Sequence, residues 1–380
     1  MRMKVLIFAG YYVPSVKGGG PIQSIKNLVD NLSDDIEFYI VAEDRDLGDS
    51  RPFQGIETDK WLQVGRSKVY YVNSSKMTWK KISKIMGSIE YDFLYLNSFF
   101  SYKYSMIPFI LSVAKGKKKS VVLAPRGQFS PGALGLKSTK KNIFLRVVKK
   151  MNLYKNITWH ATAESESEDI GQVFGTNIDV KIANNLTANY KQLNYEKNVA
   201  KEPGIIKIIF VSRIHPKKNL EQAIIFLKDI TGQIEFNIYG PIEDEEYWKS
   251  CERLINTLPS NIKISYKGII KHEHIIGIFK DHHIFLFPTL GENYGHVISE
   301  ALIGGCPVII SNQTPWRKLE EKKIGWDIDL NNKSGFVEAI QYCVDLNEKS
   351  YLLLSKNAFS YAQINSNKQV HLEANLQLFK

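Results

Sequence analysis

Short apolar runs alternate with longer segments of helical periodicity along the whole chain. In the first half, the apolar runs lie at 4–10, 36–42, 68–72, 93–97, 120–125 and 157–163. In the second half, the same rhythm returns at 205–213, 234–240, 262–268, 284–288 and 307–311. Continuous apolar runs separated by helices are typical of parallel strands in a sheet covered on both faces. The pattern predicts an α/β protein with two Rossmann-like, doubly wound domains in tandem.

A polar stretch without clear periodicity, 184–204, separates the two halves and ends in Pro-Gly. We therefore predict an N-terminal domain at 1–184, a linker at 185–204 and a C-terminal domain at 205–355. A C-terminal helix at 356–380 could pack back on the N-terminal domain. Ligands of doubly wound sheets bind outside the carboxyl ends of the strands. We expect the site in a cleft where the two domains face one another.

Composition narrows the class of protein. The chain has 380 residues, of which 44% are hydrophobic, as in soluble globular proteins of two domains. It contains no run of about 18 apolar residues, so no membrane span is predicted. The basic and then apolar start at 1–13 lacks a cleavage-site pattern, and we interpret it as a buried strand rather than a signal peptide. Three widely spaced cysteines give neither a disulfide framework nor a metal pair, which fits a cytoplasmic protein.

The formal charge of +11 favours an anionic partner. Segment 137–155 has seven basic residues and no acidic one. Its apolar residues recur at helical spacing beside lysines: Ile143, Phe144, Val147, Val148 and Met151, near Lys140, Lys141, Lys149 and Lys150. This pattern fits a helix lying on an anionic membrane, and equally a surface helix whose apolar stripe faces the core. Nucleic acid is the least favoured partner, because no aromatic residues interleave with the charges.

A glycine-rich loop follows the first apolar run. Gly18, Gly19 and Gly20 precede a helix that we expect to begin near Pro21. Glycines let a backbone approach a ligand closely, and a helix N-terminus offers free N–H groups to an anion. The loop matches neither G-x-G-x-x-G nor a Walker motif, so a flexible loop without a ligand stays an alternative.

Two cations follow the buried strand that ends at Val211 in the second half. Arg213 and Lys218 lie in the expected strand-to-helix loop. An arginine fork and a lysine point charge beside a helix N-terminus can hold a diphosphate without metal, although both could also be solvated cations. We therefore expect no metal cofactor. The D-x-D matches at 44–46 and 327–329 are discounted as metal sites, as is the histidine-rich segment 272–283, which we expect on a surface helix.

Glu292 and Glu300 lie eight residues apart, on either side of the expected start of a helix at His296. Eight helical residues span about 12 Å. The two carboxylates of a retaining glycosidase lie only about 5 Å apart. The spacing favours two hydroxyl acceptors at opposite ends of one ligand over an acid–base pair.

These segments carry a resemblance to a known family. "GENYGHVISEALIGGCPVIIS" is similar to the E-x7-E motif of retaining GT-B glycosyltransferases of family 4. "SRIHPKKNLEQAI" resembles the Arg-x4-Lys donor-phosphate motif of that family, "VPSVKGGG" its N-terminal glycine loop, and "HATAESESEDI" the segment that ends its N-terminal domain. The motifs span nearly the whole chain in the expected order. The resemblance implies a GT-B fold and a metal-independent transferase that uses a UDP- or GDP-type sugar donor.

The resemblance also implies a role for individual residues. Arg213 and Lys218 would hold the donor diphosphate and stabilise it as it leaves. Glu292 would contact the donor sugar, and Glu300 would accept hydrogen bonds from the ribose. The backbone that cradles the sugar and phosphate would be that of Asn293, Tyr294, Gly295, His296 and Val297. The nucleobase pocket would be lined by Gly240, Gly268 and Ile269, while Gly19 and Gly20 would close on the phosphate from the other domain.

One segment departs from the pattern of many relatives. Where these carry a histidine after an N-domain strand, this chain reads "LAPRGQFSPGAL" at 123–134. "PRG" followed by Pro-Gly-Ala-Leu resembles a subgroup linked to bacterial surface polysaccharides. We expect Arg126 to face the cleft and contact the donor phosphate or the acceptor, with a structural cap as the alternative.

The resemblance therefore implies a retaining glycosyltransferase of O-antigen or capsule biosynthesis. Its acceptor would be a glycan hydroxyl, lipid-linked and displayed at the inner face of the cytoplasmic membrane. A GT-B epimerase or phosphorylase and a binding module without turnover are the alternatives.

Overall fold

The computed structural model describes residues 2–380 apart from 117–119, 131–133, 135–137, 191 and 367. The chain folds into two compact units, which are described separately. Unit 1 comprises Met1–Ala188 and Asn367–Lys380, and unit 2 comprises Asn189–Ser366. The division falls inside the expected linker, and the C-terminal residues belong to unit 1.

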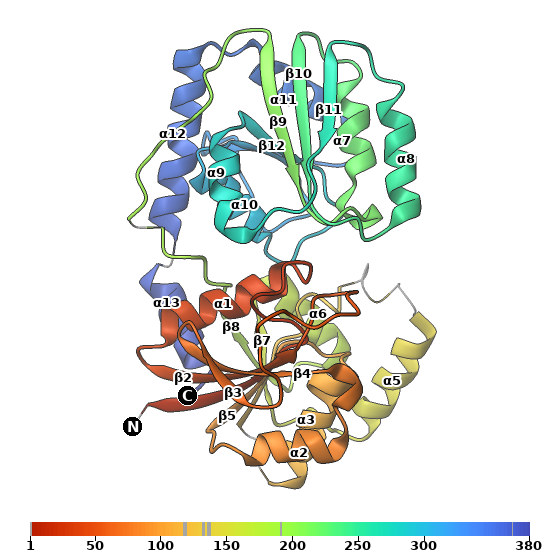
Figure 1. Ribbon diagram of the computed structural model, residues 1–380, viewed down its shortest axis with the longest axis vertical. Helices are drawn as coiled ribbons and strands as arrows, with labels where there is room; N and C mark the ends of the chain where they lie inside the picture. Colours follow the sequence, from red (N-terminus) through yellow and green to blue (C-terminus); the bar gives the residue numbers. More distant parts are fainter. Residues whose placement is uncertain (1, 117–119, 131–133, 135–137, 191, 367) are drawn as a thin grey trace. The chain divides into compact units, whose positions relative to one another are not determined.

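Unit 1 is built on an eight-stranded sheet (Figure 1). Its strands are β1 Met3–Phe8, β2 Ile36–Glu43, β3 Trp61–Val64, β4 Ser67–Val72, β5 Phe93–Leu96, β6 Val121–Leu123, β7 Thr158–Ala161 and β8 Asp179–Ile182. The order is β3-β4-β2-β1-β5-β6-β7-β8, and only β3 is antiparallel to its neighbour. The order reverses between β1 and β5, so the loops after these two strands meet at a topological switch point.

Helices cover both faces of this sheet. They are α1 Gly20–Leu32, α2 Trp79–Gly87, α3 Ile107–Ala114, α5 Ser138–Lys150, α6 Glu164–Phe174 and α13 Gln369–Gln377, with a π-helical turn at Tyr102–Met106. One core cluster joins the sheet to α2, α3, α5 and α6, and a second joins it to α1 and the segment around α13. The alternating strand residues Leu6 and Ile7 enter opposite clusters, as the period of two requires.

The chain end packs on unit 1 through α13. The Phe379 ring lies 5.8 Å from that of Phe93 and 6.0 Å from that of Tyr95. Asn375 donates to the Asn184 carbonyl at 2.9 Å. The C-terminal segment around α13 is therefore part of the second core cluster of unit 1, although its sequence comes after the whole of unit 2.

Unit 2 is built on a six-stranded parallel sheet (Figure 1). Its strands are β9 Ile205–Val211, β10 Gln233–Tyr239, β11 Ile262–Tyr266, β12 Ile284–Phe287, β13 Val308–Ser311 and β14 Gly325–Ile328. The order is β11-β10-β9-β12-β13-β14. This is the doubly wound order with its reversal between β9 and β12, so the loops after these strands meet at the switch point.

Helices again cover both faces of the sheet. They are α7 Leu220–Leu227, α8 Glu245–Ile255, α9 Ile275–Lys280, α10 His296–Ile303, α11 Lys333–Asp345 and α12 Glu348–Asn365, with single 3-10 turns at Pro216–Lys218 and His272–His274. Helix α10 packs on α9 and α12, and α7 packs on α8 and α11. The two Rossmann-like units predicted from the sequence are confirmed.

Candidate active site

Two loops meet at the switch point of unit 2 and carry the predicted catalytic residues. The first follows β9 and holds Arg213 and Lys218, and the second follows β12 and holds Glu292. The Leu290 N–H donates to the Lys217 carbonyl at 2.9 Å, which ties the second loop to the first. Lys218 and Glu292, 74 positions apart in the sequence, are in this way fixed side by side at the carboxyl edge of the sheet.

The Lys218 ammonium forms an ion pair with the Glu292 carboxylate. Their side chains are only 12% and 15% exposed. Asn219, in the left-handed region at φ 60°, ends the 3-10 turn that carries Lys218 and donates to the Pro288 carbonyl at 2.8 Å. The turn is therefore anchored to the end of β12, and the structure brings together the residues assigned to the diphosphate and to the donor sugar.

Arg213 lies in the same loop but has a different partner. Its guanidinium donates to the Glu243 carboxylate at 2.7 Å, and both side chains are 36% exposed. Lys217 lies between the two predicted cations, close enough for their charges to change its pKa. Partial withdrawal of its ammonium from water lowers the pKa of Lys217, and the charges of Lys218 and Arg213 lower it further while Glu292 opposes them. The loop therefore carries three neighbouring cations, one more than the sequence predicted.

Glu300 lies in α10 and does not contact the Lys218–Glu292 pair in the described residues. Its side chain is 6% exposed, and its Oε1 lies 2.7 Å from Nε2 of His272. The two glutamates therefore have separate partners, and their service at opposite ends of one ligand stays a prediction.

The loop between Glu292 and α10 is shaped by Gly295. This residue caps the helix in the left-handed conformation at φ 78°, which favours glycine. The helix that follows presents its first N–H groups at the carboxyl edge of the sheet, where an anion can bind them. The Tyr294 carbonyl accepts from the Trp316 indole at 2.7 Å, and burial of the Tyr294 phenol raises its pKa. His296 and Val297 open α10, and Asn293 lies in the loop.

The two glycines assigned to the nucleobase pocket follow β10 and β11. The Gly240 N–H donates to the Gly268 carbonyl at 2.9 Å. Gly240 has φ 136°, and a Cβ there would collide with the Ser212 carbonyl. Gly268 has φ 79° but faces open space, and Ile269 beside it is 47% exposed. At position 240 a side chain has no room, so only glycine fits. At position 268 there is room, but the positive φ favours glycine.

The glycine loop of unit 1 is held by a carboxylate that the sequence analysis had discounted. Asp46, part of the D-x-D match, is 7% exposed. It accepts hydrogen bonds from the Ser15 hydroxyl, the Val16 N–H at 2.8 Å and the Lys17 N–H at 3.1 Å. This clasp fixes the loop just before Gly19, which caps α1 at φ 68°. Gly19 and Gly20 belong to unit 1, so their relation to the unit 2 loops stays a prediction.

Arg126 lies at the switch-point edge of unit 1. Its guanidinium donates to Asn97 at 2.7 Å, to Asn185 at 2.6 Å and to the Tyr95 hydroxyl at 2.7 Å. The Tyr95 hydroxyl in turn lies 2.8 Å from Nδ1 of the buried His160. This network uses three of the five N–H donors that a guanidinium carries. Arg126 therefore ties strand ends together, and its contact with a substrate stays a prediction.

The histidine-rich segment is only partly at the surface. The expectation of a surface helix is wrong for His282 and His283, which are 4% and 2% exposed. His282 lies 3.0 Å from the Asn237 amide, and His283 accepts the Lys207 N–H at 2.8 Å. Burial lowers the pKa of both, that of His283 to about 3. These two side chains hold the sheet, while His272 and His274 are more exposed.

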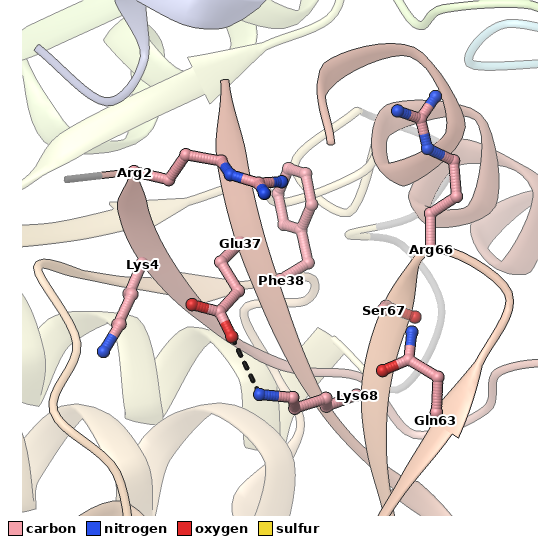
Figure 2. A pocket seen from close by; sticks show the side chains of 8 residues that line it. All are labelled: Arg2, Lys4, Glu37, Phe38, Gln63, Arg66, Ser67 and Lys68. Carbon is pink, nitrogen blue, oxygen red and sulfur yellow. Dashed lines mark hydrogen bonds and ion pairs between the residues drawn. The ribbon is translucent and has the colours of Figure 1, made fainter. Parts of the chain in front are cut away.

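A cavity of about 490 Å³ opens at the amino ends of the unit 1 strands, at the opposite edge from Arg126. It is lined by Arg2, Lys4, Glu37, Phe38, Gln63, Arg66, Ser67 and Lys68. The Lys68 ammonium lies 2.9 Å from the Glu37 carboxylate. Figure 2 shows the Arg66 guanidinium pointing away from this pair. Arg66 pairs instead with Asp34. The cations do not converge on a common point, and we assign no ligand to this cavity.

Sequence reasoning missed His272, Lys217 and Asp46. Its position next to a motif residue was the available signal for Lys217. Asp46 and His272 lie in patterns that the sequence marks, a D-x-D match and a histidine-rich segment, but these patterns suggested metal sites and not the contacts that the two residues make. Each becomes notable only through a partner in another segment, at 300 for His272 and at 15–17 for Asp46.

Residues 191–360 match the family model described as "Glycosyl transferases group 1". This segment is a glycosyltransferase group 1 domain. The matched segment covers most of unit 2, including both loops of the candidate site. A comparison with curated proteins finds no significant match.

Several solved structures resemble the chain over its whole length. Sucrose-phosphate synthase from Thermosynechococcus elongatus has a TM-score of 0.72 at 16% identity, with 100% of this chain and 98% of that chain covered. Anabaena HepE in complex with UDP and glucose has a TM-score of 0.70 at 16% identity, with 99% and 98% covered. The lipopolysaccharide outer core galactosyltransferase WaaB has a TM-score of 0.61 at 12% identity, with 99% of each chain covered. At these identities the likeness establishes the fold, which is GT-B.

Proposed function

We propose that this glycosyltransferase moves a sugar from a nucleoside-diphosphate sugar to a hydroxyl of a glycan acceptor, with retention at the anomeric carbon. The observation that carries the proposal is the meeting of Lys218 and Glu292 at the switch point of unit 2, with Arg213 in the same loop. A cluster of fixed cations beside a carboxylate can bind a diphosphate and a sugar hydroxyl together. HepE, which shares the fold, is described in complex with UDP and glucose.

The chemistry follows from where charge develops. When the bond from the anomeric carbon to the donor phosphate breaks, negative charge builds up on the leaving diphosphate. Lys218 and Arg213 stabilise that charge in place, because preorganised charges need no reorganisation during the reaction. Glu292 is committed to Lys218 in this structure and serves as a hydroxyl acceptor rather than a nucleophile. The acceptor attacks from the face that the nucleotide leaves, and the departing phosphate takes its proton.

The first experiment incubates the protein with UDP-, GDP- and dTDP-sugars, with and without a glycan acceptor, and follows the products by NMR. Release of nucleoside diphosphate with a sugar of unchanged anomeric configuration supports the proposal. Epimerised donor without release identifies an epimerase, and release that requires inorganic phosphate identifies a phosphorylase. Lys218→Ala should lower kcat by about 100-fold or more. A variant that keeps its turnover within about threefold of wild type removes the assigned role.

We further propose that the acceptor is lipid-linked and that the enzyme works at the inner face of the cytoplasmic membrane. Helix α5 supports this, because it has two apolar faces. Phe144, Leu145 and Val148 pack in the core of unit 1, where Leu145 and Val148 are buried. The expected core-facing stripe is thus present on one side of the helix.

The other side of α5 remains apolar and exposed. Ile143, Val147 and Met151 recur every four residues and are 56%, 50% and 61% exposed. Lys149 and Lys150 lie in the last turn of the helix, and Lys150, three residues after Val147, falls on the same side as these apolar residues. The segment 137–155 has no acidic residue. Exposed apolar side chains among lysines fit the interface of an anionic bilayer. The side chain of Lys140 lies outside the described residues. No helix in the described ranges is long and apolar enough to span a membrane.

Flotation with anionic liposomes tests this surface. Binding by wild type and its loss in a variant with Lys141, Lys149 and Lys150 changed to Gln support the proposal. A matched control changes three lysines of unit 2, Lys228, Lys249 and Lys267, to Gln and should float like wild type. If wild type and both variants float to the same extent, or if none of the three floats, the proposed membrane contact is wrong. A surface polysaccharide such as O-antigen or capsule is the product class that this location favours.

A further inference from the structure

His272 and Glu300 come from different segments and meet at the carboxyl edge of unit 2. His272 lies in the 3-10 turn after β11, and Glu300 lies in the second turn of α10. Nε2 of His272 is 2.7 Å from Oε1 of Glu300. Neither the metal interpretation nor the structural role of His282 and His283 accounts for this contact.

Glu300 depends on this partner. Its side chain is 6% exposed, and a carboxylate withdrawn from water is costly unless a donor or a cation compensates it. Among the described residues, His272 is the one side chain that donates to the Glu300 carboxylate. Tyr190 and Tyr294 lie near enough for the Glu300 charge to raise the pKa of their phenols, but neither donates to it.

We propose that His272 is a positioning residue for the ribose-binding carboxylate of Glu300. The imidazole Nε2–H occupies Oε1 and fixes the plane of the carboxylate. Oε2 is then left to accept the ribose hydroxyl of a nucleoside diphosphate. This inference rests on the proposed function, because it needs a nucleotide whose ribose meets Glu300.

A fixed carboxylate matters because the ribose presents two hydroxyl donors that lie close together, so the acceptor must be placed accurately. An acceptor that rotates freely loses part of each hydrogen bond to conformational entropy, whereas a held one does not. His272 itself is 37% exposed on its side chain and contributes no core packing comparable with that of His282 or His283. Its loss should therefore change ribose recognition more than stability.

Titration calorimetry first screens UDP, GDP and dTDP, to show which nucleoside diphosphate wild type binds, and then compares two ligands. The pair used is that diphosphate and its analogue without ribose hydroxyls. For dTDP, which carries a deoxyribose, the hydroxyl tested is the 3′-hydroxyl. Wild type should prefer the complete ribose by roughly 10- to 100-fold, the range expected of hydrogen bonds to a charged acceptor. His272→Ala should reduce this preference to within about threefold and leave the affinity for the dideoxy analogue unchanged.

Two variants make the comparison specific. His272→Gln keeps an N–H donor on a side chain of similar reach and should retain most of the preference. His274→Ala is the matched control, because His274 lies in the same 3-10 turn, is 66% exposed and pairs with its neighbour Glu273. It should bind both ligands like wild type. Glu300→Gln should lose the preference as His272→Ala does.

Each other outcome overturns the inference in a distinct way. If His272→Ala keeps the preference, His272 does not position Glu300. If His272→Ala weakens the binding of both ligands equally, the role of His272 is structural. If His272→Ala strengthens the binding of the complete diphosphate, His272 competes with the ribose for Glu300. If wild type binds a diphosphate without preferring the complete ribose, Glu300 has no ribose to hold. If wild type binds no nucleoside diphosphate, the proposed function fails, and this inference fails with it.

Discussion

The Lys218–Glu292 pair should be energetically coupled before any substrate binds. Lys218→Met and Glu292→Gln each remove one charge and keep most of the side-chain volume. Either change leaves the remaining partner, 12% or 15% exposed, without its counter-charge. The double variant removes both charges and should restore part of the lost stability.

The structure sets the size of this coupling. Two unit charges about 3 Å apart attract by about 5 kcal/mol at an effective dielectric constant near 20, and desolvation offsets much of this. Exposed pairs contribute about 0–1 kcal/mol, whereas breaking a fully buried pair costs about 3–5 kcal/mol. Because both side chains are mostly but not fully withdrawn from water, we expect about 2 kcal/mol.

Thermal unfolding measures the effect. A loss of about 2 kcal/mol should lower the Tm of a unit of this size by about 4–8 °C in each single variant. In the double variant the decrease should be clearly smaller than the sum of the two. Arg213→Met with Glu243→Gln is the matched control, because that pair is 36% exposed on both sides and should couple by less than about 1 kcal/mol. Strictly additive Tm changes for Lys218 and Glu292 would refute the reasoning.

Three further predictions follow from other parts of the molecule. Gly240→Ala should destabilise unit 2 by about 2–4 kcal/mol, since the φ of 136° at Gly240 and the nearby Ser212 carbonyl leave no room for a Cβ. Urea unfolding measures this loss. The control variant Gly277→Ala, at a position that faces open space, should unfold close to wild type. Burial lowers the pKa of His160 to about 3, so the unfolded chain binds more protons below about pH 6.5, and lowering the pH from 7 to 5 should cost about 2 kcal/mol. His160→Gln should flatten this pH dependence, and an unchanged slope would contradict the assignment. Val147→Glu should abolish flotation with anionic liposomes without changing the Tm, because the side chain is 50% exposed.

Most central strands could be predicted, because their apolar runs match their burial. The run at 205–213 became β9, with Ile208, Ile209 and Phe210 fully buried. The strands missed were β3, β8 and β14, which have four residues each. All three lie at sheet edges, where one side of the strand has no neighbour and fewer apolar residues are needed. A sequence pattern based on burial is weakest at such positions.

The site was predictable where one segment carries its own signal. Glu292, Gly295 and Glu300 surround the start of α10 as their spacing predicts. The partner of each carboxylate was not predictable, because Lys218 and His272 are brought there by strand order and loop anchoring rather than by local sequence. Arg126 shows the same limit, since its three hydrogen bonds join it to strand β5 and to two loops that lie far from it in the sequence.

Titration calorimetry with nucleoside diphosphates tests the central claim most directly, namely that the switch-point loops of unit 2 bind the donor diphosphate. The account predicts that wild type binds one of UDP, GDP or dTDP at one site. An Arg213→Ala, Lys218→Ala variant should bind the same ligand at least about 100-fold more weakly, as the loss of two charge-assisted contacts requires. Equal affinity of wild type and the double variant would contradict the account.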